Sequence, residues 1–278
     1  MRDLELLEAT AISLVELDES QLRWDSSRAA LKTFKENFTR TARMIEAPIY
    51  AALTADAHRL ALHRVFKGEP TIEQCEAYRG PIGEEMEKLM VQLLNVDKET
   101  QKQAMIYCAH NLNGFIQRTT NVHAIFESLL NAIIVQAWTS FEVLFSELHK
   151  LSRTEHPACF HHLDPALTFD FQKRETIRLS YKNAFRDNGR IKNVLNEQCV
   201  DALALLRNLI VHKGGVVDGM FHRSCEDAHL IAWADLPVPS QFPVSGKTVR
   251  SLIDPNAKCA CRLIKSVDKW ISDNLPTK

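Results

Sequence analysis

Apolar residues recur every three or four positions along most of the chain, with no long stretch of strict alternation. This spacing places apolar side chains on one face of a helix, so it predicts amphipathic helices rather than strands. The predicted helical ranges are Asp3 to Leu17, Gln21 to Glu46, Ile49 to Phe66, Thr71 to Leu94, Asp97 to Ile116, Asn121 to Leu151, 170 to 190, Val194 to His212 and Asn256 to Leu275. The expected fold class is therefore all-α.

Prolines, glycines and capping residues mark where these helices begin and end. Pro48 is expected to end the second helix, and the third is expected to stop at Gly68 to Pro70. Thr71 to Gln74 has the form of a capping box, and the helix that it opens is expected to break near Gly80 and Pro81. The segment from Asp235 to Pro255 is rich in Pro, Ser and Gly, and it is read as a loop or a small hairpin.

The helices fall into two expected domains. Residues 1–120 form an N-terminal helical module without a recognisable catalytic motif, either a partner-binding or dimer-supporting unit or an extension of the core. Residues 121–278 begin with the longest predicted helix, whose wide apolar face predicts burial on much of its circumference.

A short stretch of the second domain gathers polar groups on an otherwise apolar helix. Arg207, Asn208 and His212 lie within six residues that also hold Leu209, Ile210 and Val211. The following Gly214 and Gly215 are typical of a helix C-terminus, so His212 is expected in the last turn. Positions five apart point about 140° from each other on a helix. Arg207 and His212 therefore cooperate either if the turn unwinds at the glycines or, as we favour, across a symmetric dimer interface.

This stretch resembles the R-x4-6-H motif of the HEPN superfamily, and RNLIVH carries the match. The continuation HKGGVVDGMF and the earlier helix with AWTSFEVLFSEL are also similar to bacterial HEPN-domain proteins, so the resemblance covers roughly residues 120–275. It implies a HEPN-like helical bundle in the C-terminal half, a homodimer and, in many members, a metal-independent endoribonuclease. Some members are inactive or serve other roles.

Two further sets of residues are candidates for the same site. Glu142 lies at the margin of the apolar face of its helix, where an unpaired carboxylate is costly. Arg207 is its candidate partner, and a solvated residue at the edge of the face is the alternative. Basic residues at intervals of four predict one ridge on a single helix over 170–190: Arg174, Arg178, Lys182, Arg186 and Arg190. The ridge is a candidate RNA-backbone track, with a solvated face or pairing with the acidic N-terminal part as the alternatives.

The sequence gives little support for a disulfide framework, a zinc site, a P-loop or a membrane span. Seven scattered cysteines without a CxxC pair favour reduced thiols, and the His and Cys residues of the 156–170 loop lack zinc-site spacing. VSGKT lacks the first glycine of a P-loop. No signal sequence or membrane-spanning run is recognised, so a cytoplasmic protein without metal or cofactor is expected. The net charge of −1 excludes a globally basic nucleic-acid binder but not a local basic patch.

The expected function is a metal-independent endoribonuclease of the HEPN type, acting as a toxin or defence effector. Metal-free RNA cleavage needs a group that moves protons near neutral pH and a cation that holds the phosphate, and the RNA supplies its own 2′-OH as nucleophile. His212 and Arg207 fit these roles, and Asn208 is placed to orient the imidazole or bind a phosphate oxygen. The alternative is a catalytically silent HEPN-like module that binds nucleotides or proteins. In either case the N-terminal helices are candidates for recruiting a protein partner or antitoxin.

Overall fold

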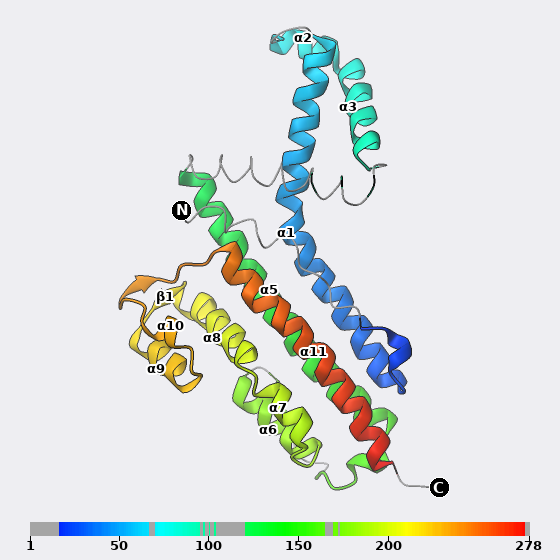
Figure 1. The fold of residues 1–278 in the computed structure, drawn as a ribbon, viewed down its shortest axis with the longest axis vertical. Helices are drawn as coiled ribbons and strands as arrows, with labels where there is room; N and C mark the ends of the chain where they lie inside the picture. Colours follow the sequence, from blue (N-terminus) through cyan, green and yellow to red (C-terminus); the bar gives the residue numbers. More distant parts are fainter. Residues whose placement is uncertain are drawn as a thin grey trace. The chain divides into compact units, whose positions relative to one another are not determined.

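The computed structural model describes residues 17–66, 70–94, 97, 100, 103, 120–164, 169–171 and 173–275. Within these ranges the chain is predominantly helical, with one pair of very short strands (Figure 1). The predicted all-α class is confirmed. The predicted helices over Asp3 to Leu17 and through most of Asp97 to Ile116 lie outside the described residues.

The chain divides into two compact units. One comprises Met1–Thr10 and Arg43–Phe126, and the other comprises Ala11–Ala42 and Glu127–Lys278. The division near residue 126 lies close to the predicted boundary at 120. The observed division differs from the predicted one at Ala11–Ala42. This segment was expected in an N-terminal domain, but it groups with the C-terminal unit.

The first long helix, α1, runs without interruption over Asp25–Val65. The prediction that Pro48 ends a helix was therefore wrong, because Pro48 lies inside α1. A proline removes one backbone donor from a helix and does not prevent the flanking residues from remaining helical. Ala47, Ala51 and Ala52 flank it, and alanine has the highest intrinsic helix propensity.

In the unit that contains Arg43–Phe126, two further helices follow α1. They are α2, Ile72–Ala77, and α3, Arg79–Leu94. Thr71 and Gln74 form the predicted capping box, which is confirmed, and the break falls at Tyr78, just before Gly80 and Pro81. Arg64 of α1 is 2.7 Å from the Glu85 carboxylate of α3.

The other unit has an aromatic core around α5, Thr120–Glu155. The predicted long helix over Asn121 to Leu151 is confirmed, and Phe145 on it is buried. Tyr181 donates a hydrogen bond from its hydroxyl to the Phe145 carbonyl at 2.9 Å, and its ring lies 5.2 Å from that of Phe185. The ring of Phe185 is in turn 5.0 Å from that of Trp270, so three helical segments meet in one apolar cluster.

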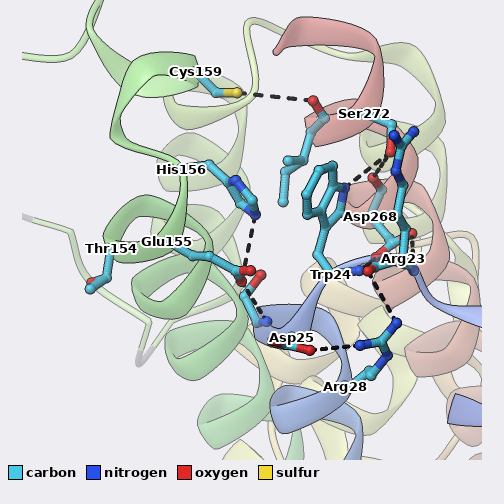
Figure 2. A network of polar contacts seen from close by, with 12 residues as sticks. Arg23, Trp24, Asp25, Arg28, Thr154, Glu155, His156, Cys159, Asp268 and Ser272 are labelled. Atoms are coloured by element: carbon cyan, nitrogen blue, oxygen red, sulfur yellow. Dashed lines mark hydrogen bonds and ion pairs between the residues drawn. The ribbon is translucent and has the colours of Figure 1, made fainter.

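Side chains of α5 and of the C-terminal helix hold the start of α1 (Figure 2). The Asp268 carboxylate accepts hydrogen bonds from the backbone N–H groups of Arg23 and Trp24, at 3.0 to 3.2 Å. Glu155 accepts a bond from the Ser26 N–H at 2.6 Å. These carboxylates satisfy donors that a helix N-terminus leaves without intrahelical partners. The preceding segment contains a short 3-10 turn, η3, at Glu19–Gln21.

The predicted single helix over 170–190 is two helices, so the expectation of one basic ridge was wrong. After the 3-10 turn η4, Pro157–Phe160, α6 spans Arg174–Ala184 and α7 spans Gly189–Leu195. Arg186 and Asp187 between them have positive φ angles of 54° and 51°. Because helical backbone needs negative φ, the register of four cannot continue from Lys182 to Arg190.

The segment after α7 carries the remaining elements. Helix α8, Gln198–Lys213, contacts α11, Gly246–Asn274, and also α9, Gly219–Asp227. The short helix α10 covers Ile231–Ala234, and strand β1, Val216–Val217, pairs antiparallel with β2, Ser240–Gln241.

The predicted hairpin or loop over 235–255 was partly wrong. Its strand residues pair with β1 rather than with each other, and its second half is helical. Ser245 and Thr248 form a capping box that starts α11 at Gly246, and Pro255 lies inside that helix.

One described stretch, Ala124–Glu155 within α5, is long and apolar enough to cross a membrane by length and composition alone. Half of its most apolar window is buried within the protein. The core helix of a soluble protein passes the same test, so this is weak evidence for a membrane span.

Candidate functional site

The C-terminal turns of α8 position the motif residues. His212 lies in the last turn, as predicted, and Gly214 at the helix end has a left-handed φ of 59°. Gly215 has a φ of 81°, and its N–H donates to the Leu209 carbonyl at 3.1 Å. A Cβ at Gly215 would collide with the Gln241 side chain, which donates to the Gly214 carbonyl at 3.0 Å. The two glycines thus end α8 directly after the motif.

The predicted motif residues line one cleft of about 560 Å³. Arg207, Asn208 and His212 reach it from α8, and Glu142 reaches it from α5. Other polar residues around the cleft are Lys173, Arg174, Glu175 and Ser224. Glu142 and the R-x4-H residues, proposed together from the sequence, therefore share a surface.

Glu142 contacts both Arg207 and Trp138. Its carboxylate lies 3.9 Å from the Arg207 guanidinium, which confirms the expected pairing, and accepts a hydrogen bond from the indole N–H of Trp138 at 2.6 Å. Burial raises the pKa of Glu142, while the Trp138 hydrogen bond and the Arg207 charge act to lower it. The effect of burial on the pKa of Glu142 thus outweighs the combined effects of Trp138 and Arg207.

Arg207 is held on two sides. Its Nη1 donates to the Asn208 side-chain oxygen at 2.9 Å, and its Nη2 faces Glu142. Its Nε is buried and has no hydrogen-bond partner among the described residues. About a fifth of the side chain, 22%, is exposed. The guanidinium is therefore oriented from within the chain and keeps unused donor capacity.

His212 and Asn208 are exposed on the same helix. Among the hydrogen bonds and ion pairs of the described residues, none involves the His212 imidazole, and none joins it to Arg207. This agrees with the divergence expected for positions five apart on a continuous helix. Because the helix stays regular to Lys213, the alternative in which the turn unwinds at the glycines is not seen.

The five predicted RNA-binding residues do not share one surface. Arg174 lines the motif cleft, whereas Arg178 and Lys182 line a separate pocket of about 240 Å³ between α6 and α7. Arg186 and Arg190 are exposed, in the turn and at the start of α7.

Two of these arginines also donate hydrogen bonds to acceptors within the chain. Arg174 and Arg178 bond to the same Asp201 oxygen at 3.1 and 2.7 Å, and Arg178 also donates to the Leu195 carbonyl at 2.9 and 3.1 Å. Asp201 is 8% exposed, so the two cations offset the cost of burying a carboxylate. The sequence interpretation considered acids on the ridge itself and in the N-terminal part, and it missed Asp201, which lies 23 residues after Arg178.

Sequence reasoning also missed four residues of the site: Trp138, Lys173, Glu175 and Ser224. The i, i+4 spacing of Trp138 and Glu142 was available as a signal, since residues four apart on a helix are neighbours. Lys173 precedes α6 and Ser224 lies on α9, and no spacing rule connects either of them to α8.

Two histidines of the 156–162 segment have a ring nitrogen beside a backbone carbonyl. His161 lies 2.7 Å from the Ala158 carbonyl, and His162 lies 3.2 Å from the Asn183 carbonyl. Among the described residues, three potential metal ligands gather elsewhere, at Glu197, Cys199 and Cys259.

Comparisons with known proteins assign no family. No protein-family model matches the chain, and neither a curated protein nor a solved structure matches it significantly. The function must therefore be inferred from the residues of the cleft and their geometry.

Proposed function

We propose that this protein is a metal-independent endoribonuclease of the HEPN type, acting as a toxin or defence effector in the cytoplasm. One observation carries the proposal: Arg207, Asn208 and His212 line a single cleft with Glu142, and the cleft is large enough for a nucleotide. Lys173 and Arg174 add positive charge to the same cleft. A phosphate bound there would meet cations from α8 and from the start of α6.

The proposed reaction uses the 2′-OH of the RNA as nucleophile. His212 takes the proton from this hydroxyl or delivers one to the leaving 5′-oxygen, and its exposure gives the substrate access to the imidazole. Arg207 neutralises the charge that builds on the phosphate, and Glu142 and Asn208 hold its guanidinium in position. The imidazole serves one of the two proton transfers, and water serves the other.

Two copies of α8 complete the proposed site. Because Arg207 and His212 diverge on one helix, we assign the catalytic pair to Arg207 of one chain and His212 of a second chain. Val211 lies between them on α8 and is 47% exposed, while Val216 and Met220 nearby are 41% and 61% exposed. Exposed apolar side chains beside the motif support a self-complementary contact at this surface.

A second candidate, a catalytically silent HEPN-like module that binds nucleotides or proteins, is favoured by a different observation. Arg207 already has Asn208 and Glu142 as partners within its own chain, so part of its capacity to bind a phosphate is occupied. In this case the unit containing Arg43–Phe126 would recruit a protein partner or an antitoxin.

RNA cleavage in the presence of EDTA distinguishes the two functions. Purified protein is incubated with structured and unstructured RNAs, beside His212→Ala and the matched variant Lys213→Ala, whose exposed side chain is the next residue on α8. The nuclease proposal expects cleavage by the parent and by Lys213→Ala but not by His212→Ala. RNA binding without cuts by any of the three would instead support the silent module.

A further inference from the structure

Two cysteines that lie 60 residues apart in the sequence meet where α8 begins. Cys199 is in the first turn of α8 and Cys259 is in the middle of α11, and their sulfur atoms are 4.0 Å apart. Cys199 is partly exposed, whereas Cys259 is 1% exposed. The pair therefore combines a sulfur that solvent reaches with a second sulfur directly behind it.

The surroundings of the pair favour a thiolate on Cys199. The Cys259 thiol lies within hydrogen-bond reach of the Val194 carbonyl, at 3.5 Å, and of Cys199. The neutral Cys199 thiol lies within donating distance of the Glu197 carboxylate, at 3.9 Å, and of Cys259, and once Cys199 ionises, the Cys259 S–H can turn to donate to it. This bond lowers the pKa of Cys199, against the opposing effects of burial and of the Glu197 carboxylate. The same contact, together with burial, raises the pKa of Cys259.

Arg262 adds a fixed positive charge. Its guanidinium pairs with Glu197 and lies 3.9 Å from the Cys259 sulfur, and its charge also acts to lower the pKa of Cys199. Glu197 thus has a cationic partner already, and a metal ion bound by Glu197, Cys199 and Cys259 would face this guanidinium. The arrangement suits an ionised thiol with a resolving thiol better than it suits a bound metal ion.

We propose that Cys199 and Cys259 form a redox-sensitive dithiol that a peroxide oxidises to an intramolecular disulfide. The Cys199 thiolate attacks one oxygen of hydrogen peroxide, the O–O bond breaks, and Cys199 sulfenic acid and hydroxide form. The Cys259 sulfur then attacks the Cys199 sulfur, the S–O bond breaks, and the Cys259 proton leaves with the hydroxyl group as water. Two thiols lose two electrons in total, and the peroxide is reduced to two molecules of water.

The required movement is small. A disulfide has sulfur atoms about 2 Å apart, so the two sulfurs must approach by roughly 2 Å in total. Asn256 donates a hydrogen bond to the Cys199 carbonyl at 2.8 Å, which holds the start of α8 against α11 while the thiol side chains rotate. The resulting disulfide would link α8, the helix that carries Arg207 and His212, to α11.

Peptide mapping of the full chain tests the proposal. Reduced protein is treated with hydrogen peroxide, alkylated under denaturing conditions and digested with trypsin. The expected product joins peptide 193–207, which contains Cys199, to peptide 259–262, and dithiothreitol should separate them. The number of free thiols should fall by two from the seven of the sequence. Absence of this product at peroxide levels that oxidise the protein would overturn the proposal.

Peptide 259–262 also contains Cys261, so a matched variant identifies the partner. Cys261 is buried two residues further along α11, and burial raises the pKa of its thiol. Cys261→Ser should retain the cross-link, whereas Cys259→Ser should lose it and leave a sulfenic acid on Cys199 that dimedone labels. A cross-link that disappears in Cys261→Ser would contradict the assignment of Cys259.

Two further measurements separate a redox pair from a metal site. Arg262→Gln, which removes the cation, should slow dimedone labelling of Cys199 several-fold in the Cys259→Ser background. Zinc is then offered to the reduced parent and to Cys199→Ser. The redox proposal would be overturned in favour of a metal site by two results together. The parent, but not Cys199→Ser, would retain stoichiometric zinc after dialysis, and this zinc would block formation of the cross-link.

Discussion

The Arg207 guanidinium lies 3.9 Å from the Glu142 carboxylate, so a cation at the end of α8 is held by an acid in the middle of α5. Glu142 is fixed in turn by the indole of Trp138, which is 2% exposed. Contacts among Trp138, Glu142, Arg207 and Asn208 connect the partly exposed Arg207 side chain to the buried core. These contacts restrict the positions that its guanidinium can take. This is the feature that makes Arg207 a candidate for holding a phosphate at a fixed position.

Replacement of Glu142 tests this positioning. Glu142→Gln keeps an oxygen for the Trp138 N–H but loses the charge that holds Arg207. If Arg207 acts on the reacting phosphate, kcat for RNA cleavage should fall about tenfold, which corresponds to about 1.4 kcal/mol, with little change in KM. Glu175→Gln is the matched control, because Glu175 lines the same cleft but pairs with Arg174. An equal loss in both variants would assign the effect to the charge of the cleft in general.

The RNA path can be located by the dependence of binding on salt. Lys173 lines the motif cleft, whereas Lys182 lines the separate pocket between α6 and α7. Each phosphate contact to single-stranded RNA contributes about 0.7 to the slope of log affinity against log salt. In a His212→Ala background, Lys173→Gln should flatten the slope by about 0.7 and Lys182→Gln should leave it unchanged. If Lys182→Gln flattens the slope and Lys173→Gln does not, the RNA follows the basic residues of α6 that the sequence indicated.

Asp201 is expected to be a structural residue. It accepts hydrogen bonds from Arg174 and Arg178, and it is nearly buried. Asp201→Ala leaves both guanidinium groups short of an acceptor and should lower the free energy of unfolding by about 2 kcal/mol, measured by urea denaturation. Lys192→Ala removes an exposed pair with Asp187 and should change the free energy of unfolding by less than about 0.5 kcal/mol. Equal stabilities of the two variants would show that the Asp201 contacts contribute nothing measurable.

We expect the buried His149 to make the folded protein less stable in acid. Burial, and to a lesser extent the charge of Arg153, lowers its pKa from 6.5 to about 4. Its ring lies against those of Phe169 and Phe171, at 4.3 and 5.2 Å. Between pH 6.5 and about 4 the unfolded chain binds a proton that the folded chain does not, so stability falls as the pH falls through this window. The full difference is on the order of 3 kcal/mol.

A substitution isolates this contribution. His149→Phe cannot titrate, so its free energy of unfolding should depend less on pH between 4 and 6.5 than that of the parent. The control His161→Gln, at an exposed position, should keep the dependence of the parent. If the parent and His149→Phe show the same dependence, the acid sensitivity arises from other groups.

Local sequence patterns predicted the parts of the fold that depend on local rules. The apolar face of α5, the capping box at Thr71 and Gln74, and the glycine end of α8 were all predicted and are all observed. Each depends on residues within a few positions of one another. The pairing of Glu142 with Arg207 is observed as well, and it was one of two alternatives that the sequence left open, the other being a solvated carboxylate.

The errors arose where a distant residue decides the structure. Arg174 and Arg178 looked like a solvent-facing ridge because nothing in the sequence connects them to Asp201 on α8. Pro48 was predicted to end a helix and Pro255 to lie in a loop or hairpin, but each lies inside a helix, since proline disfavours a helix interior without excluding it. The contact between Cys199 and Cys259 likewise depends on the packing of α8 against α11, which no spacing rule predicts.

Mixing two inactive variants tests the proposed function most directly. Arg207→Ala and His212→Ala should each abolish RNA cleavage in EDTA while keeping stability within about 2 kcal/mol of the parent, because both residues lie at a partly exposed helix end. If the catalytic pair joins Arg207 of one chain to His212 of another, an equal mixture that exchanges subunits should recover about a quarter of the parent activity, since half of the dimers hold one intact site. A mixture that forms mixed dimers but stays inactive would contradict the shared site. Failure of the parent protein itself to cleave RNA would contradict the nuclease.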